Sequence, residues 1–221
     1  MLFIFDWDGT ILDSAAKIVQ CMKLAMEDAG LEVLDAARIQ QIIGLGMQEA
    51  TDELFPAASP EQKTDLQQQY AKHFIAADQT PCSFFPGCLD VLTGLRENNH
   101  LTAVATGKSR RGLNRVLAST GIEHLFDATR CADETASKPD PRMLHELLEE
   151  LRVPAADALM IGDTSFDLAM ARKAGVMPVG VGHGVHSTEQ LVAAGAEYIA
   201  ASYDDLSIWL EGRYGLHTGG R

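Results

Sequence analysis

The chain has 221 residues, 46% of them hydrophobic and 22% charged, which is typical of a soluble globular protein with one domain or a core and an insert. Its net charge of −13 argues against nucleic acid or an anionic membrane as the main partner, and it disfavours an anionic substrate unless a metal ion or local cations neutralise it. A membrane span, a signal peptide and disulfides are not expected, because long apolar runs, a basic leader and C-x-x-C pairs are all absent. We therefore expect reduced thiols and a cytoplasmic location.

The stretch Leu2–Thr10 joins an apolar run to two carboxylates. The run Leu2–Phe5 predicts a strand that is buried on both faces, as in a parallel sheet. Asp6 and Asp8 follow its C-terminal end, where open parallel sheets bind ligands, and their spacing of two places them on one face. Because paired carboxylates repel unless a proton or cation lies between them, we predict a Mg²⁺ site. A solvated strand end whose acids cap the next helix is the alternative.

The next block is helical and lacks convincing strands from Ser14 to Ser83. Asp13 and Ser14 are suitable N-caps for its first helix. We interpret residues 14–85 as an inserted helical cap domain with linkers near Asp13 and Phe85, which leaves residues 1–13 and 86–221 as the core. The helices expected in the insert span Ala15–Ala29, two segments within Asp35–Phe55 around Gly44, and Pro60–Ala77.

In the remaining chain, short apolar runs alternate with helical patterns. This alternation predicts βαβ units and an α/β fold, a doubly wound, Rossmann-like parallel sheet. The polar tail His217–Arg221 is expected to be loose. The expected strands are Leu101–Ala105, Asp127–Cys131, Ala158–Ile161, Val176–Val181 and Tyr198–Ile199, and the expected helices are Leu89–Glu97, Arg110–Ser119, Pro141–Leu151, Phe166–Ala174 and Thr188–Ala194.

Three further stretches stand where strands of this sheet should end. Thr106–Ser109 offers hydroxyl and backbone N–H groups to an anion, although an ordinary N-cap would also explain it. Lys138 precedes a helix N-terminus, where a cation needs an anionic partner such as a phosphate or an aspartate. Asp163 and Asp167 are four residues apart at the next strand end, and because capping explains only one of these acids, metal binding is the better interpretation.

Taken in order, these stretches resemble the haloacid dehalogenase superfamily of phosphohydrolases. The resemblance rests on Asp6–Thr10, Thr106, Lys138–Pro139, and Gly162–Asp163 with Asp167, and it includes a helical cap after the first motif. The segments Asp6–Ser14, Gly44–Gly46 and Phe85–Gly87 are most similar to the phosphoglycolate phosphatase-like branch.

The resemblance implies a role for each residue. Asp6 would be the nucleophile that forms an aspartyl-phosphate, and Asp8 would protonate the leaving oxygen and then activate water. The Asp6 carboxylate, the Asp8 backbone carbonyl and Asp163 would hold Mg²⁺. Asp167 would support the metal or orient Lys138. The residues that would bind the substrate are Thr106, Gly107 and Lys138 at the phosphoryl oxygens, and Gly44 in the cap loop.

The implied activity is Mg²⁺-dependent hydrolysis of a small phosphorylated metabolite, with phosphoglycolate as one candidate. A phosphosugar mutase, a pyrophosphatase, a dehalogenase or a non-catalytic binding protein of this fold are the alternatives, and Asp8 argues against the dehalogenase. Two positions depart from the expected pattern: Trp7 is large and should point into the core, and Gly107 replaces a frequent Asn. The oligomeric state is left open.

Overall fold

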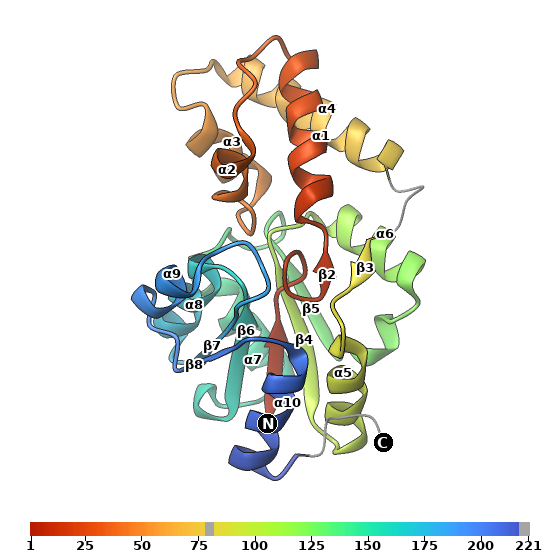
Figure 1. Ribbon diagram of the computed structural model, residues 1–221, viewed down its shortest axis with the longest axis vertical. Coiled ribbons are helices and arrows are strands. Elements are labelled where there is room, and N and C mark those ends of the chain that lie inside the picture. Colours follow the sequence, from red (N-terminus) through yellow and green to blue (C-terminus); the bar gives the residue numbers. More distant parts are fainter. Residues whose placement is uncertain (78–81, 217–221) are drawn as a thin grey trace.

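The computed structural model describes residues 1–77 and 82–216, which form an α/β body and a smaller helical body beside it (Figure 1). The α/β body contains a six-stranded sheet in the order β5-β4-β1-β6-β7-β8, and every neighbouring pair of strands is parallel. This is the doubly wound parallel sheet that the sequence predicts. Its strands are β1 (Leu2–Phe5), β4 (Leu101–Thr106), β5 (Ala128–Cys131), β6 (Ala158–Gly162), β7 (Met177–Val181) and β8 (Tyr198–Ala200).

The central strand β1 is buried on both faces, and its side chains alternate between two hydrophobic clusters. Phe3 and Phe5 pack on one face against α5, α6 and α10, whereas Leu2 and Ile4 pack on the other against α7 and α8. This explains the unbroken apolar run at the start of the chain. The helices of this body are α5 (Cys88–Glu97), α6 (Arg110–Thr120), α7 (Arg142–Leu151), α8 (Ser165–Ala174), α9 (Thr188–Ala193) and α10 (Tyr203–Tyr214).

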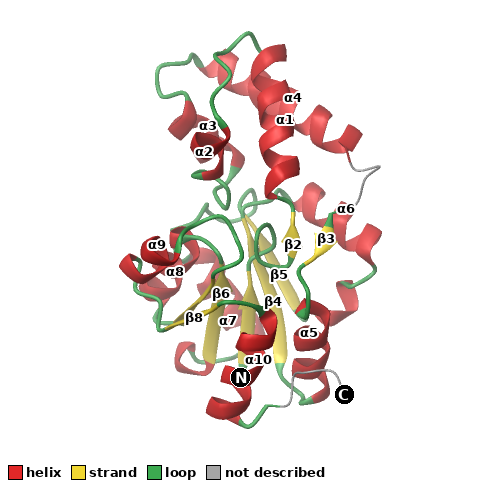
Figure 2. Cartoon of the chain, viewed as in Figure 1, coloured by secondary structure: helices red, strands yellow, loops and turns green. Residues whose placement is uncertain are grey.

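The helical body lies above the carboxyl ends of the sheet strands (Figure 2). It has its own hydrophobic cluster, which includes Met22, Met26, Ile39 and Leu66. Its helices are α1 (Ala15–Asp28), α2 (Ala36–Gln40), α3 (Met47–Leu54) and α4 (Pro60–Ala76). The two bodies are joined by a short antiparallel ribbon of β2 (Leu12–Asp13) and β3 (Ser83–Phe84). These strands lie where the sequence placed the linkers.

The expected elements occur within one or two residues of their expected ends, but two features were not predicted. The β2–β3 ribbon pairs residues about 70 positions apart, and each strand is too short to show the alternation of apolar and polar side chains that predicts a strand. Helix α10 lacks a clear polar and apolar face, so its pattern is weak. The predicted loose tail, His217–Arg221, lies outside the described residues. Within the described ranges, no helix is long and apolar enough to cross a membrane.

Candidate active site

The polar residues singled out in the sequence meet at the carboxyl edge of the sheet. Asp6 follows β1, Thr106 ends β4 and Asp163 follows β6, and these strands are neighbours in the sheet. The backbone N–H of Asp6 donates to the Ile161 carbonyl (2.9 Å), which extends the β1–β6 ladder and fixes the Asp6 backbone. Lys138 reaches the same place from the loop between β5 and α7.

Lys138 is buried with 1% of its surface exposed, and it bridges two aspartates. Its Nζ lies 2.7 Å from Asp6 Oδ1 and 2.6 Å from Asp167 Oδ1. Burial alone would lower the lysine pKa, but the charges of Asp167 and Asp6 outweigh it and raise that pKa, so Lys138 is a permanent cation. The anionic partner expected for Lys138 is therefore this pair of carboxylates.

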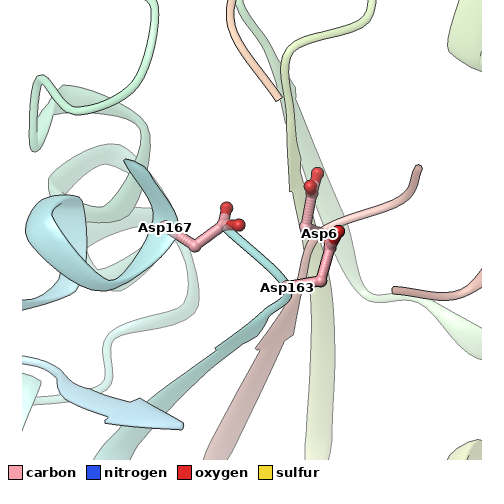
Figure 3. Close-up of side chains that lie close together, drawn as sticks. All are labelled: Asp6, Asp163 and Asp167. Atoms are coloured by element: carbon pink, nitrogen blue, oxygen red, sulfur yellow. The ribbon is translucent and has the colours of Figure 1, made fainter. Parts of the chain in front are cut away.

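Asp6, Asp163 and Asp167 form a buried cluster in which one carboxylate oxygen from each residue lies within 4.8 Å of the others (Figure 3). Burial raises the pKa of Asp6 well above its ordinary value, with the negative charges of Asp167 and Asp163 adding to the effect against the opposing Lys138. Burial and the charge of Asp167 raise the pKa of Asp163 to about 7. One ammonium does not balance three carboxylates, and a hard divalent cation would. Asp6 Oδ2 also has no hydrogen-bond partner among the described residues, so the donor set fits Mg²⁺.

Asp163 is held from two sides. Thr10 Oγ donates to its Oδ1 (2.8 Å), and the backbone N–H of Val185 donates to its Oδ2 (2.9 Å). Gly9 passes so close that a Cβ at that position would lie 2.2 Å from Asp163 Oδ2, and its φ of +80° also favours glycine. The loop between β7 and α9 thus reaches the site through Val185.

Asp167 has two partners besides the metal cluster. Its Oδ2 accepts hydrogen bonds from the N–H and the hydroxyl of Thr164 (3.1 and 2.7 Å), which caps α8. Its Oδ1 pairs with Lys138. One side chain thus both caps α8 and pairs with Lys138.

The Asp8 side chain is paired with two residues outside this cluster whose role sequence reasoning missed. Ser14 Oγ donates to its Oδ1 (2.6 Å), and Lys108 Nζ lies 2.9 Å from its Oδ2. The expectation that the Ser14 side chain caps α1 is wrong, because its hydroxyl makes no capping hydrogen bond and serves Asp8 instead. The motif containing Lys108 was noticed in the sequence, but the ion pair forms only when the loop after β4 meets the loop after β1.

A cavity of about 280 Å³ opens between the two bodies above Asp6 and Asp8. Of the residues predicted to bind substrate, Thr106, Gly107 and Gly44 line it, whereas Lys138 does not line it in the described part of the chain, nor does the predicted metal ligand Asp163. Ser109, not Thr106, caps α6 by accepting from the Gly112 N–H. Thr106 is therefore not needed as a cap, and its hydroxyl accepts a hydrogen bond from the Lys108 N–H (3.2 Å). Trp7 packs in the core against Phe126, as predicted.

Replacing Lys138 with methionine is expected to lower the free energy of unfolding by about 3 kcal/mol, because it leaves buried carboxylates without a counter-charge. The measurement is urea unfolding without metal, followed by circular dichroism. Lys173→Met, at an exposed position of α8, is the matched control and should change the free energy by less than about 0.5 kcal/mol. A stability loss equal to that of the control would show that the Lys138 ion pairs do not stabilise the fold.

A sequence model described as haloacid dehalogenase-like hydrolase matches residues 3–181. The chain belongs to this family. The match runs from β1 to β7 and so includes the carboxylate cluster, Lys138 and the inserted helices. The superfamily resemblance read from the motifs is confirmed.

Curated relatives are similar over nearly the whole chain. The protein named "Probable phosphatase IndB" of Dickeya dadantii is 33% identical over 209 residues, which cover 93% of this chain and 91% of the relative. A phosphoglycolate phosphatase of Rhodospirillum rubrum is 29% identical over 216 residues, 94% of this chain and 89% of the relative. The chain is an enzyme of the phosphatase class.

Solved structures show the same architecture. A hydrolase from Pseudomonas syringae superimposes with a TM-score of 0.88 at 25% identity, covering 96% of this chain and 99% of that one. Because coverage is nearly complete on both sides, the similarity includes both bodies of the molecule.

Proposed function

We propose that this chain is a Mg²⁺-dependent phosphomonoester hydrolase that works through an aspartyl-phosphate on Asp6. The observation that carries the proposal is the Asp6 carboxylate at the floor of the cavity. One of its oxygens is paired with Lys138, and the other has no hydrogen-bond partner within the described ranges. A carboxylate that is fixed at one oxygen and open at the other is suited to attack phosphorus.

The two half-reactions use Asp6 and Asp8 in turn. An Asp6 oxygen bonds to phosphorus while the bond from phosphorus to the leaving oxygen breaks, and Asp8 gives that oxygen a proton. Water then attacks the phosphorus, Asp8 takes its proton, and the bond to Asp6 breaks to release phosphate. Ser14 and Lys108 hold the Asp8 carboxylate in one direction, which favours proton transfer at a fixed site.

The metal would be held by the Asp6 and Asp163 carboxylates and the Asp8 backbone carbonyl, with Asp167 beside them. Bound Mg²⁺ supplies positive charge to the phosphoryl oxygens and so makes a phosphate dianion acceptable in an acidic protein. Thr106 and the Gly107 N–H are proposed to bind the same oxygens from the loop after β4. Lys138 keeps Asp6 in place, and its direct contact with the phosphoryl group stays a prediction.

We also propose that residues 14–85 are a cap that closes on the core and excludes water from the site. Gly46 N–H donates to Ser137 Oγ (2.7 Å), and Gln190 Nε2 donates to Gln41 Oε1 (3.0 Å), so the cap loops already touch the core. The chain passes between the two bodies at the paired strands β2 and β3, and this ribbon is the proposed hinge.

Because Gly107 has no side chain, the cap loop can approach the core closely at this position. A Cβ at this position would lie 2.5 Å from the Gly44 carbonyl oxygen and 2.4 Å from that of Leu45. Gly107→Ala is therefore expected to hold the cap loop away from the site and lower kcat/KM about tenfold, the size expected for overpacking. Gly212→Ala, which meets nothing within 4 Å in α10, is the control and should keep the parent kcat/KM. Unchanged kcat/KM in Gly107→Ala would mean that this close approach is not used during turnover.

The proposed function is tested by phosphate release from p-nitrophenyl phosphate. Release should require Mg²⁺, stop on addition of EDTA and return when Mg²⁺ is restored in excess. Continued release by the purified, metal-free protein would contradict the metal requirement. Phosphoglycolate is the first metabolite to test, because several relatives are named phosphoglycolate phosphatases. A cytoplasmic location is part of the proposal and agrees with the free state of Cys21, Cys82, Cys88 and Cys131.

A further inference from the structure

The cavity above Asp6 offers much more room than a phosphate group and a two-carbon acid need. Its volume is about 280 Å³, whereas a cavity of roughly 150 Å³ already accepts benzene. The reacting phosphoryl group must sit at Asp6, so the rest of the substrate extends toward the cap. The chemistry of the cap wall then decides which alcohols fit.

The wall contributed by the cap is apolar. No lysine or arginine of the described cap residues lines the cavity. Two of its members carry polar groups: Tyr70 has a hydroxyl, and Gln67 donates to Gln48 Oε1 (3.1 Å) and Thr51 Oγ (3.0 Å). Tyr70 and Phe74 form an aromatic pair with ring centroids 5.6 Å apart. The apolar side chains that define the wall are Ile18, Met22, Ile43, Met47, Phe74 and Ile75.

Two of the cations near this wall, Lys108 and Lys17, have partners. Lys108 pairs with Asp8, and its Nζ lies 4.9 Å from the centre of the Phe74 ring. Lys17 Nζ lies 4.7 Å from the same centre. Arg111 and Arg115 of α6 line the core side of the cavity, and Arg111 is exposed to solvent. A second anionic group directed toward the cap, away from these α6 arginines, would face an apolar wall in a protein whose net charge is −13.

We propose that the substrate is a phosphomonoester whose alcohol portion is uncharged and largely apolar, about as large as a phenylethyl group. This inference rests on the proposed function and names its substrate class. Burying an apolar group against the cap wall replaces water there and stabilises the bound state, whereas burying a carboxylate against the same apolar side chains costs binding.

The test compares three phosphomonoesters whose leaving alkoxides are similar: 2-phenylethyl phosphate, ethyl phosphate and phosphoglycolate. We expect kcat/KM for 2-phenylethyl phosphate to exceed that of each of the others about tenfold or more. Phosphoglycolate or ethyl phosphate at the same kcat/KM or higher would overturn the inference and leave the proposed function standing. The Asp6→Asn protein, with Mg²⁺ present, allows the same comparison by calorimetric binding. If the parent protein hydrolyses no phosphomonoester, the proposed function fails and the inference fails with it.

The inference is also tested by placing a positive charge in the apolar wall, which should shift the substrate preference toward phosphoglycolate. Met47→Lys adds a cation to the cavity and should raise kcat/KM for phosphoglycolate about tenfold while lowering it for 2-phenylethyl phosphate. Gln68→Lys is the matched control, because Gln68 is exposed on the cap helix α4 and does not line the cavity. Equal gains for phosphoglycolate in both variants would mean that general charge, not the wall, limits this substrate, and would overturn the inference.

Discussion

Replacing Asp6 with asparagine is expected to reduce phosphate release by roughly 10⁶-fold, the size of loss that follows removal of a catalytic nucleophile. The amide has nearly the shape of the carboxylate but is a poor nucleophile toward phosphorus. The fold should survive, because the change removes one of three mutually repelling buried carboxylates and leaves the Lys138 pair with Asp167 intact. The measurement is phosphate release from p-nitrophenyl phosphate, with circular dichroism of the same sample.

Asp13→Asn is the control for this variant. Asp13 is exposed on β2, so its replacement changes the net charge equally without touching the cluster. Mass spectrometry of the Asp6→Asn sample excludes conversion of the asparagine back to aspartate. Near-parent phosphate release from such a sample would show that Asp6 is not the nucleophile.

The second large effect is expected for Asp8→Asn, which should slow turnover by about 10²–10⁴-fold, or roughly 3–5.5 kcal/mol in activation free energy. The Asp8→Asn variant keeps the backbone carbonyl of residue 8, and its side-chain oxygen still accepts a hydrogen bond from Ser14 or Lys108. The amide cannot transfer a proton, however. Since Asp8 lies outside the carboxylate cluster, the side-chain metal ligands should be unaffected.

The two half-reactions of this variant should separate with an activated ester. The p-nitrophenolate group leaves without much protonation, so the first step should suffer less than the attack of water. Phosphoenzyme should then accumulate on Asp6, visible by rapid quench with labelled substrate as an acid-stable label that hydroxylamine removes. If Asp8→Asn hydrolyses an alkyl phosphate at the parent rate, Asp8 is not the general acid.

The sequence determined the core and the placement of its acids for local physical reasons. The apolar run Leu2–Phe5 is buried on both faces, and β-strand geometry together with βα alternation places Asp6 and Asp163 at the same edge of the sheet. These patterns depend on residues close together in the sequence, so they can be recognised without knowledge of the tertiary contacts. The same holds for Trp7, whose position between the two acids directs it into the core.

The hydrogen bonds and ion pairs of these acids, and the cap residues that lie over them, follow only from long-range packing. Ser14 looks like a helix cap in the sequence, yet its hydroxyl binds Asp8, because the turn after β1 brings the two together. Lys108 meets Asp8, and Gly107 meets the carbonyl of Gly44, only when three segments separated by 36 to 100 residues converge. Such contacts have no periodic signal, since they depend on how the cap docks on the sheet. The shape and apolar wall of the cavity arise in the same way, and for this reason the sequence predicts the reaction site more fully than the substrate.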